Sequence, residues 1–297
     1  MQSGVHIYCF AASYAAALAI EALGAWRHLP WRRRGVVAAT GAGIVAHTWY
    51  LGERVAATPG AALVSPHDWY LSAAWLLAAI TLAATFYYPS RSLGVFLLPA
   101  VLALIAASLP ASADPVVSNS ATRFWSRLHA GLLMLGSLAV LIGFLSGLMY
   151  LLQSWRLKRK AAPLSEGFRL PSLEWLEKVN GRALPAAAVL VGLGFLTGVI
   201  VRWSQADARG GVPWTDPVVL SLGVWVLWLL VAEGFRLLYP AARGQKVAYL
   251  SVATFALLVL TLAAFTLTTS LHGEPAAADV TPGDAAGLLH PTEGDPR

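Results

Sequence analysis

The chain has 297 residues, of which 57% are hydrophobic and only 12% are charged, and its formal net charge is +6. This balance excludes an ordinary soluble domain, in which about a quarter of the residues are charged. A run of about 20 apolar residues crosses a bilayer as a helix, because lipid offers the backbone no hydrogen-bond partners. The sequence therefore predicts a multi-pass membrane protein.

Eight apolar runs follow one another along the chain, and they predict an all-α bundle of eight transmembrane helices. The runs are Val5–Leu23, Val36–Gly52, Trp69–Tyr88, Leu93–Leu109, Leu128–Trp155, Leu184–Trp203, Val218–Tyr239 and Val247–Leu271. Residues 1–272 would form one membrane domain. The remaining tail, Gly273–Arg297, is rich in Ala, Pro, Gly and acidic residues. It cannot bury enough apolar surface to order itself, so we expect it to be disordered.

The distribution of Lys and Arg predicts the orientation of these helices. Of the 21 basic residues, six fall at one side of the eight-helix topology and the other fifteen at the opposite side. The six are Arg54, Arg123, Arg127, Arg202, Arg209 and Arg297. Since cytoplasmic loops carry the excess of positive charge, both termini are expected on the extracytoplasmic side of the plasma (inner) membrane.

The cytoplasmic side carries two further predictions. In the loop 156–183, Ser172 and Glu174 are typical of a helix start, and Leu173, Leu176 and Val179 share one face. This pattern predicts a short amphipathic helix lying on the membrane. Two acids near this side, Glu21 and Glu233, are expected to form interfacial ion pairs, since Arg236 follows Glu233 by one helical turn.

Cysteine usage excludes a c-type cytochrome and a thiol–disulfide relay. Cys9 is the only cysteine, so no internal disulfide forms, and no CxxCH motif is present for covalent haem attachment. The basic run Arg156–Lys160 lies at a cytoplasmic helix end, where lipid headgroups are its expected partners and nucleic acid is not.

The histidines gather at the extracytoplasmic side. His129 opens the fifth run and His272 closes the eighth, so both are expected at the same depth. Two neutral imidazoles facing one another are what six-coordinate haem iron requires. The alternative is that each is an amphipathic residue at the interface. His47, toward the outer end of the second run, is a further candidate, or it hydrogen-bonds a neighbouring helix and binds nothing.

The other histidines are assigned no ligand. His6, His67 and His290 lie in extracytoplasmic loops or tails, where we expect solvated surface roles, and His28 alone is cytoplasmic.

The outer loop between the sixth and seventh runs adds aromatic candidates. Trp203 and Trp214 prefer the interface without any ligand. Their flat faces would also suit a macrocycle, and Arg202 and Arg209 are able to pair with its propionates.

Taken together, these residues resemble the cytochrome c assembly family of integral membrane haem-handling proteins, the CcsA, CcmC and HemX-like group. The resemblance covers about residues 120–273. It rests on Trp125-Ser126-Arg127-Leu128-His129, Met149-Tyr150-Leu151-Leu152-Gln153, Leu170-Pro171-Ser172-Leu173-Glu174, Gly194-Phe195-Leu196-Thr197-Gly198 and Leu271-His272-Gly273. Of the family's tryptophan-rich motif, WGxxWxWDP, the chain keeps Gly210, Asp216 and Pro217, with Trp214 displaced by one position.

The resemblance implies that His129 and His272 are axial ligands of a non-covalently bound haem b. It implies a platform that includes Trp214, Asp216 and Trp203, and a position for His47 among the membrane histidines. A partner cytochrome c synthetase subunit and apocytochrome c would receive the haem. No nucleophile or phosphate loop is visible, so the chain is at most a subunit of a haem attachment system. Alternatives are a HemX-like accessory protein of haem biosynthesis, a small-molecule transporter or a structural subunit.

Overall fold

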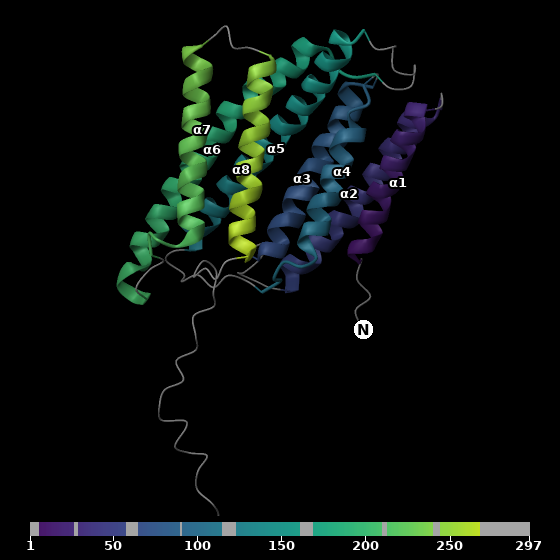
Figure 1. Ribbon diagram of the computed structural model, residues 1–297. Helices are drawn as coiled ribbons and strands as arrows, with labels where there is room; N and C mark the ends of the chain where they lie inside the picture. Colours follow the sequence, from purple (N-terminus) through teal and green to yellow (C-terminus); the bar gives the residue numbers. More distant parts are fainter. Residues whose placement is uncertain are drawn as a thin grey trace, which may run out of the picture.

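The computed structural model describes residues 6–26, 29–57, 65–89, 91–114, 123–160, 169–209, 213–239 and 244–267. Within these ranges, every regular element is a helix (Figure 1). The eight helices are α1 (Ile7–Trp26), α2 (Arg32–Ala57), α3 (Pro66–Tyr87), α4 (Gly94–Ser108), α5 (Arg123–Lys158), α6 (Leu173–Arg209), α7 (Pro217–Leu238) and α8 (Gln245–Leu267). Each coincides with one of the predicted apolar runs. The C-terminal tail lies outside the described residues.

Six of these helices are long and apolar enough to cross a membrane: α1, α3, α5, α6, α7 and α8. The helix α4 has only 15 residues, and α2 begins with three arginines, Arg32 to Arg34. The chain is therefore a helical membrane bundle.

The helices α5 and α6 are much longer than their apolar runs, with 36 and 37 residues. At ~1.5 Å per residue each exceeds the ~30 Å of a bilayer core. The prediction of a separate amphipathic helix after Ser172 is wrong, because α6 continues through Pro185 to Arg209 without a break. Ser172 does cap the helix, accepting a hydrogen bond from the Trp175 N–H at 3.4 Å. Leu176 is fully buried in the protein core and does not face lipid.

The helices form two four-helix units. In each unit the neighbours follow the same closed order: α1 with α2, α2 with α3, α3 with α4 and α4 with α1, and likewise from α5 to α8. The two units meet chiefly along α3 and α5. At this junction Leu138, Leu145 and Met149 of α5 join the core of the first unit.

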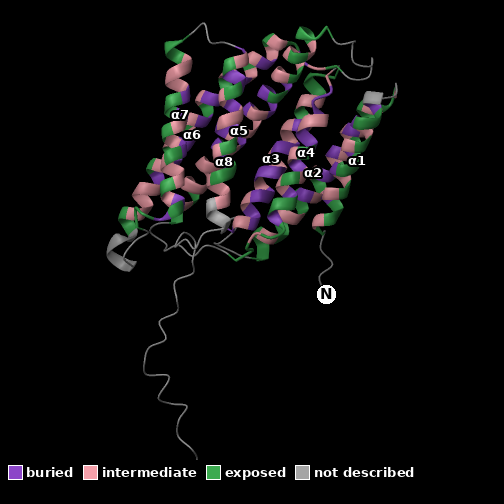
Figure 2. Ribbon diagram, viewed as in Figure 1, coloured by how far each residue is buried: buried purple, intermediate pink, exposed green. Residues whose placement is uncertain are grey.

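Small residues bring α5 against its neighbours. A Cβ added at Gly136 would lie 2.5 Å from Val191 of α6, and one at Gly147 would lie 3.1 Å from the Ala248 backbone of α8. Such close backbone approach is typical of membrane helices, which associate through packing and not through a hydrophobic driving force. Apolar residues on the outward faces of the helices remain exposed (Figure 2).

The first residues of α1 and the last residues of α8 lie at one end of the bundle, which we name the terminal end (Figure 1). The end of α1, the start of α2, the end of α7 and the start of α8 lie at the opposite end (Figure 1). The start of α3 and the start of α5 are level with one another at the terminal end, since the Trp69 indole N–H donates to the Ala130 carbonyl at 3.4 Å.

The helix α4 runs between the same two levels as its longer neighbours. At the opposite end the Ser92 N–H, just before α4, donates to the Arg169 carbonyl just before α6, at 3.0 Å. At the terminal end the His67 N–H in the first turn of α3 donates to the Ser112 carbonyl just after α4, at 3.1 Å.

The helix α2 likewise extends from one end to the other. Arg32 at its start lies 3.7 Å from the Glu21 carboxylate near the end of α1. Arg54 in its last turn forms an ion pair with Asp68 in the first turn of α3. The predicted pairing of Glu233 with Arg236 is also confirmed, with an Nε to Oε2 distance of 2.9 Å.

Candidate functional site

His129 lies in the second turn of α5 and contacts α6 at the terminal end. Its Nδ1 is 2.7 Å from the carbonyl oxygen of Gly194. A carbonyl oxygen only accepts, so Nδ1 carries the proton and donates this bond. In the neutral ring, Nε2 is then the nitrogen with the lone pair. Histidines that ligate metals commonly have this arrangement, with the second nitrogen oriented by a backbone carbonyl.

The glycines of α6 make room for this ring. A Cβ added at Gly198 would lie 2.7 Å from His129 Cε1 and 2.9 Å from Nδ1. A Cβ at Gly194 would lie 2.6 Å from Leu133. By contrast, a Cβ at Gly192 meets nothing within 4 Å. The sequence motif around Gly194 and Gly198 therefore has a local purpose, which is to seat His129 against the helix.

The tryptophans of the outer loop lie in different environments. The guanidinium of Arg202 stacks over the Trp214 ring, 4.4 Å from its centroid, and covers one of its faces. Trp214 is 47% exposed and Trp203 is 68% exposed. The Nη1 of Arg202 is buried and has no hydrogen-bond partner. This is the only candidate residue at the described part of the loop that offers an unused buried donor.

Asp216 has a structural role in the described residues. It is 4% exposed and caps α7, with its Oδ1 accepting from the Val218 N–H at 2.9 Å. Pro217 occupies the first helical position, where its missing N–H costs nothing. The predicted place of Asp216 beside a cofactor stays a prediction.

The second predicted ligand, His272, lies outside the described residues, as do His28, His290 and Gly210. The helix α8 ends its described course at Leu267, at the same end of the bundle as the start of α5. The helices α5 and α8 are neighbours, and Phe144 and Phe255 stack between them at a centroid distance of 4.1 Å.

His47 lies in the other four-helix unit. It is fully buried, and its ring stacks on Phe10 of α1 at 4.1 Å with an interplanar angle of 4°. Its Nδ1 is 3.4 Å from the Tyr14 hydroxyl, and its Nε2 is buried with no hydrogen-bond partner. The prediction that His47 contacts a neighbouring helix is therefore confirmed, while its role toward a cofactor stays a prediction.

Polar residues continue along the inward side of α1 and α2. Thr40 is fully buried and its hydroxyl has no hydrogen-bond partner, and Glu21 is 3% exposed with one oxygen in the same state. Buried polar groups within a membrane bundle are costly and usually functional. We name Glu21, Thr40 and His47 the polar seam of α1 and α2.

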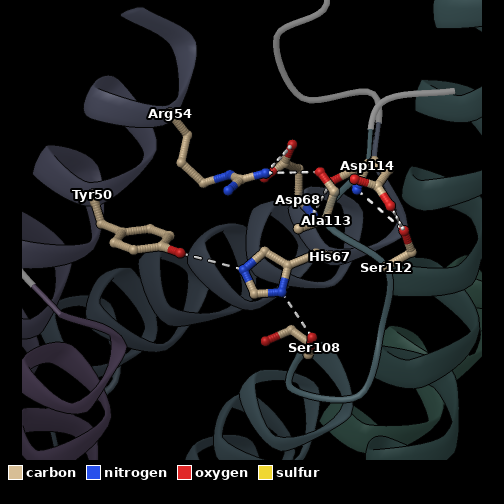
Figure 3. A network of polar contacts seen from close by, with 9 residues as sticks. Tyr50, Arg54, His67, Asp68, Ser108, Ser112, Ala113 and Asp114 are labelled. Atoms are coloured by element: carbon tan, nitrogen blue, oxygen red, sulfur yellow. Dashed lines mark hydrogen bonds and ion pairs between the residues drawn. The ribbon is translucent and has the colours of Figure 1, made fainter. Parts of the chain in front are cut away.

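His67 corrects the expectation of a solvated surface role. It is buried in the first turn of α3, where Nδ1 donates to the Ser108 carbonyl at 2.8 Å and Nε2 lies 3.3 Å from the Tyr50 hydroxyl (Figure 3). Both ring nitrogens are thus engaged by the ends of α4 and α2. Hydropathy predicts a start of this apolar run at Trp69, which places His67 in a loop.

The ion pair of Arg54 and Asp68 lies beside His67 in the same polar network (Figure 3). Arg54 Nη2 also reaches Asp68 Oδ2 and the Ala113 carbonyl, each at 3.3 Å. Sequence reasoning missed this network. Its signal was the run Ser65-Pro66-His67-Asp68, in which Ser65 caps the helix and Pro66 opens it.

Within the described ranges, no group of three or more His, Cys, Asp or Glu side chains is placed to hold a metal ion. Comparison of the sequence with models of known protein families, with curated proteins and with solved structures found no match. The terminal end of the bundle has two polar sites. One is the imidazole of His129, oriented by Gly194, and the other is the polar network around His67. The hydrogen bond from Trp69 to Ala130 connects the helices that carry them.

Proposed function

We propose that the protein binds haem b non-covalently at the terminal end and presents it to a partner in cytochrome c biogenesis. The observation that carries this proposal is the hydrogen bond from His129 Nδ1 to the Gly194 carbonyl. It fixes the ring and assigns the lone pair to Nε2, the atom that an axial ligand uses.

The residues that surround this ring fit the same group. The unsatisfied Nη1 of Arg202 suits a propionate, because guanidinium pairs strongly with carboxylates. Trp214 lies beside it, and the described course of α8 ends at Leu267, at the end of the bundle where His129 lies. Bound haem would supply the iron, while His129 and His272 would supply axial nitrogens and hold the ring for transfer. A synthetase subunit and apocytochrome c are the proposed partners.

All eight helices are proposed to cross the plasma (inner) membrane, with the terminal end extracytoplasmic. Length and composition alone do not mark α2 and α4 as membrane-spanning helices. The contacts at both ends of these two helices support a full crossing by each of them. The excess of Lys and Arg at the opposite end supports this orientation.

An accessory role in haem biosynthesis is the second candidate. It is favoured by the coverage of one Trp214 face by Arg202, which leaves less aromatic surface for a macrocycle than the family motif would provide. A transporter is a third candidate and would use the polar seam of α1 and α2.

The deciding experiment is the absorption spectrum of the protein purified in detergent. We expect a low-spin haem spectrum that is lost in His129→Ala and in His272→Ala and kept in the tail variant His290→Ala. A colourless protein that haem does not reconstitute would overturn haem binding and leave the accessory role. Substrate flux in liposomes that is independent of haem would indicate a transporter.

A further inference from the structure

At the opposite end of the bundle, Arg91 is held by aromatic rings. It lies in the turn between α3 and α4, and its guanidinium carbon is 4.6 Å from the centroid of the Tyr88 ring and 4.7 Å from that of Trp175. The two rings meet edge to face at 5.3 Å. Because Trp175 belongs to α6, this cluster joins the first four-helix unit to the second.

Arg91 pairs with no carboxylate in the part of the chain that the structure describes. Its Nη1 is buried without a hydrogen-bond partner, and no acidic side chain of the described residues lies within ion-pair distance of it. Two other half-buried arginines near helix ends behave differently, since Arg32 pairs with Glu21 and Arg236 pairs with Glu233. No acidic side chain among the described residues therefore offsets the positive charge of Arg91.

The guanidinium of Arg32 also reaches this turn. Ser92, the next residue, accepts from Arg32 Nη1 at 3.3 Å through its hydroxyl and donates its backbone N–H to the Arg169 carbonyl. Glu21 is ion-paired with Arg32 at 3.7 Å, and its carboxylate lies against Gly94 at the start of α4.

The two ring contacts also leave hydrogen-bond donors of Arg91 for an anion. Aromatic rings offer a guanidinium no hydrogen-bond acceptor oxygen, whereas its planar N–H donors match the oxygens of a phosphate. Aromatic residues beside basic residues at a helix end are the usual setting for a membrane interface. Anionic lipid headgroups supply phosphates at such an interface.

We propose that Arg91, Tyr88 and Trp175 form a binding site for the phosphate of an anionic phospholipid in the adjoining leaflet. Arg91 supplies the charge, and the two rings fix its orientation and contact the glycerol region. The lipid would contact the junction of the two four-helix units and stabilise it. This site is separate from the haem site proposed at the terminal end.

The test is native mass spectrometry and thermal unfolding of the full chain in detergent, titrated with phosphatidylglycerol, with phosphatidylcholine and with inorganic phosphate. The wild type should bind at least one phosphatidylglycerol tightly and gain thermal stability from it, and phosphatidylcholine should give neither effect. In Arg91→Gln this binding should weaken about fivefold to tenfold, the effect expected for one basic residue at an anionic surface.

Arg159→Gln is the matched control. Arg159 also stacks on a tryptophan, Trp155, at 4.7 Å and at the same end, but it is exposed and meets one ring only. The control should keep the tight lipid. Arg91→Lys, which keeps the charge and loses the planar stacking, should bind more weakly than wild type.

Three outcomes would overturn the proposal. Equal binding of the two lipids by the wild type removes the anionic site, whether or not Arg91→Gln folds. Equal losses of phosphatidylglycerol binding in Arg91→Gln and Arg159→Gln would show that surface charge alone causes the binding. Equal stabilisation by inorganic phosphate alone assigns the site to a free anion and excludes the lipid.

Discussion

The imidazole of His129 occupies the space that a side chain on residue 198 would need. A Cβ built at Gly198 lies 2.7 Å from His129 Cε1, which is closer than real Cβ atoms approach their neighbours. The glycine in α6 thus determines where the ring in α5 lies.

Gly198→Ala is expected to displace His129 and to reduce haem occupancy. The added methyl pushes the ring away from the Gly194 carbonyl, which loosens the orientation of Nε2. The measurement is the haem-to-protein ratio of purified variants. Gly192→Ala is the control, because its Cβ meets nothing within 4 Å. Equal haem loss in both variants would contradict a role for this contact.

Arg54→Met is expected to destabilise the fold by about 2–4 kcal/mol, because it leaves the buried carboxylate of Asp68 without its ion partner. The Asp68 side chain is 5% exposed and that of Arg54 is 27% exposed. Asp68→Asn should therefore cost less, since the freed arginine reaches water more easily.

The measurement for this pair is the free energy of unfolding in mixed detergent micelles. Glu233→Gln is the comparison, since its pair with Arg236 is more exposed and lies within one helix, and its loss should cost below about 1 kcal/mol. A smaller effect for Arg54→Met than for Glu233→Gln would argue against a stabilising network at His67.

Gly94→Ala is expected to destabilise the bundle by about 1–3 kcal/mol through overpacking. The new Cβ would lie 2.8 Å from Glu21 Oε1 and 3.0 Å from its Cγ, and both groups are enclosed between α1 and α4. Gly223→Ala, with open space around it, should be neutral or stabilising, as in an ordinary helix interior. Thermal unfolding of the two variants tests this, and a Gly94→Ala variant as stable as wild type would contradict the contact.

His47→Phe is expected to fold as stably as the wild type or better. Phenylalanine keeps the stack on Phe10 and removes the buried Nε2 that has no partner. His47→Ala should lose about 2–4 kcal/mol, because it leaves a cavity in the core. If His47 contributes to haem binding, the spectrum of His47→Phe will change while its stability does not.

Single cysteines introduced in a Cys9→Ser background test the topology. Pro89→Cys lies before α4 and Ser112→Cys lies after it, and both positions are exposed. If α4 crosses the membrane, an impermeant thiol reagent added to intact cells will label Ser112→Cys and not Pro89→Cys. Labelling of both variants from the same side would show that α4 does not cross.

The number and approximate position of the helices were predictable, because the apolar runs and the helix-start residue Ser172 are local signals. The length of α6 was not, since hydropathy marks only the part of a helix that faces lipid, and the polar turns before Pro185 belong to the same helix. The position of His129 at the start of α5 was predictable. Its hydrogen bond to Gly194 was not, because it depends on how two helices pack.

The burial of His67 was hidden for the same reason. Its partners Tyr50 and Ser108 come from α2 and α4, and no spacing in the sequence relates them. Residue type and expected depth in the membrane were enough to select candidate residues. The hydrogen bonds of these residues join different helices, so only the structure shows them.

The arrangement in two rings of four helices has a consequence for how the chain is put together. Each half closes on itself, and the border between them is largely one helix against one helix. Two separately expressed fragments, one ending with α4 and the other beginning with α5, would each insert as a four-helix bundle and associate in the bilayer. The carboxyl-terminal fragment would carry both His129 and His272. It would therefore be the smallest fragment in which to measure porphyrin absorption.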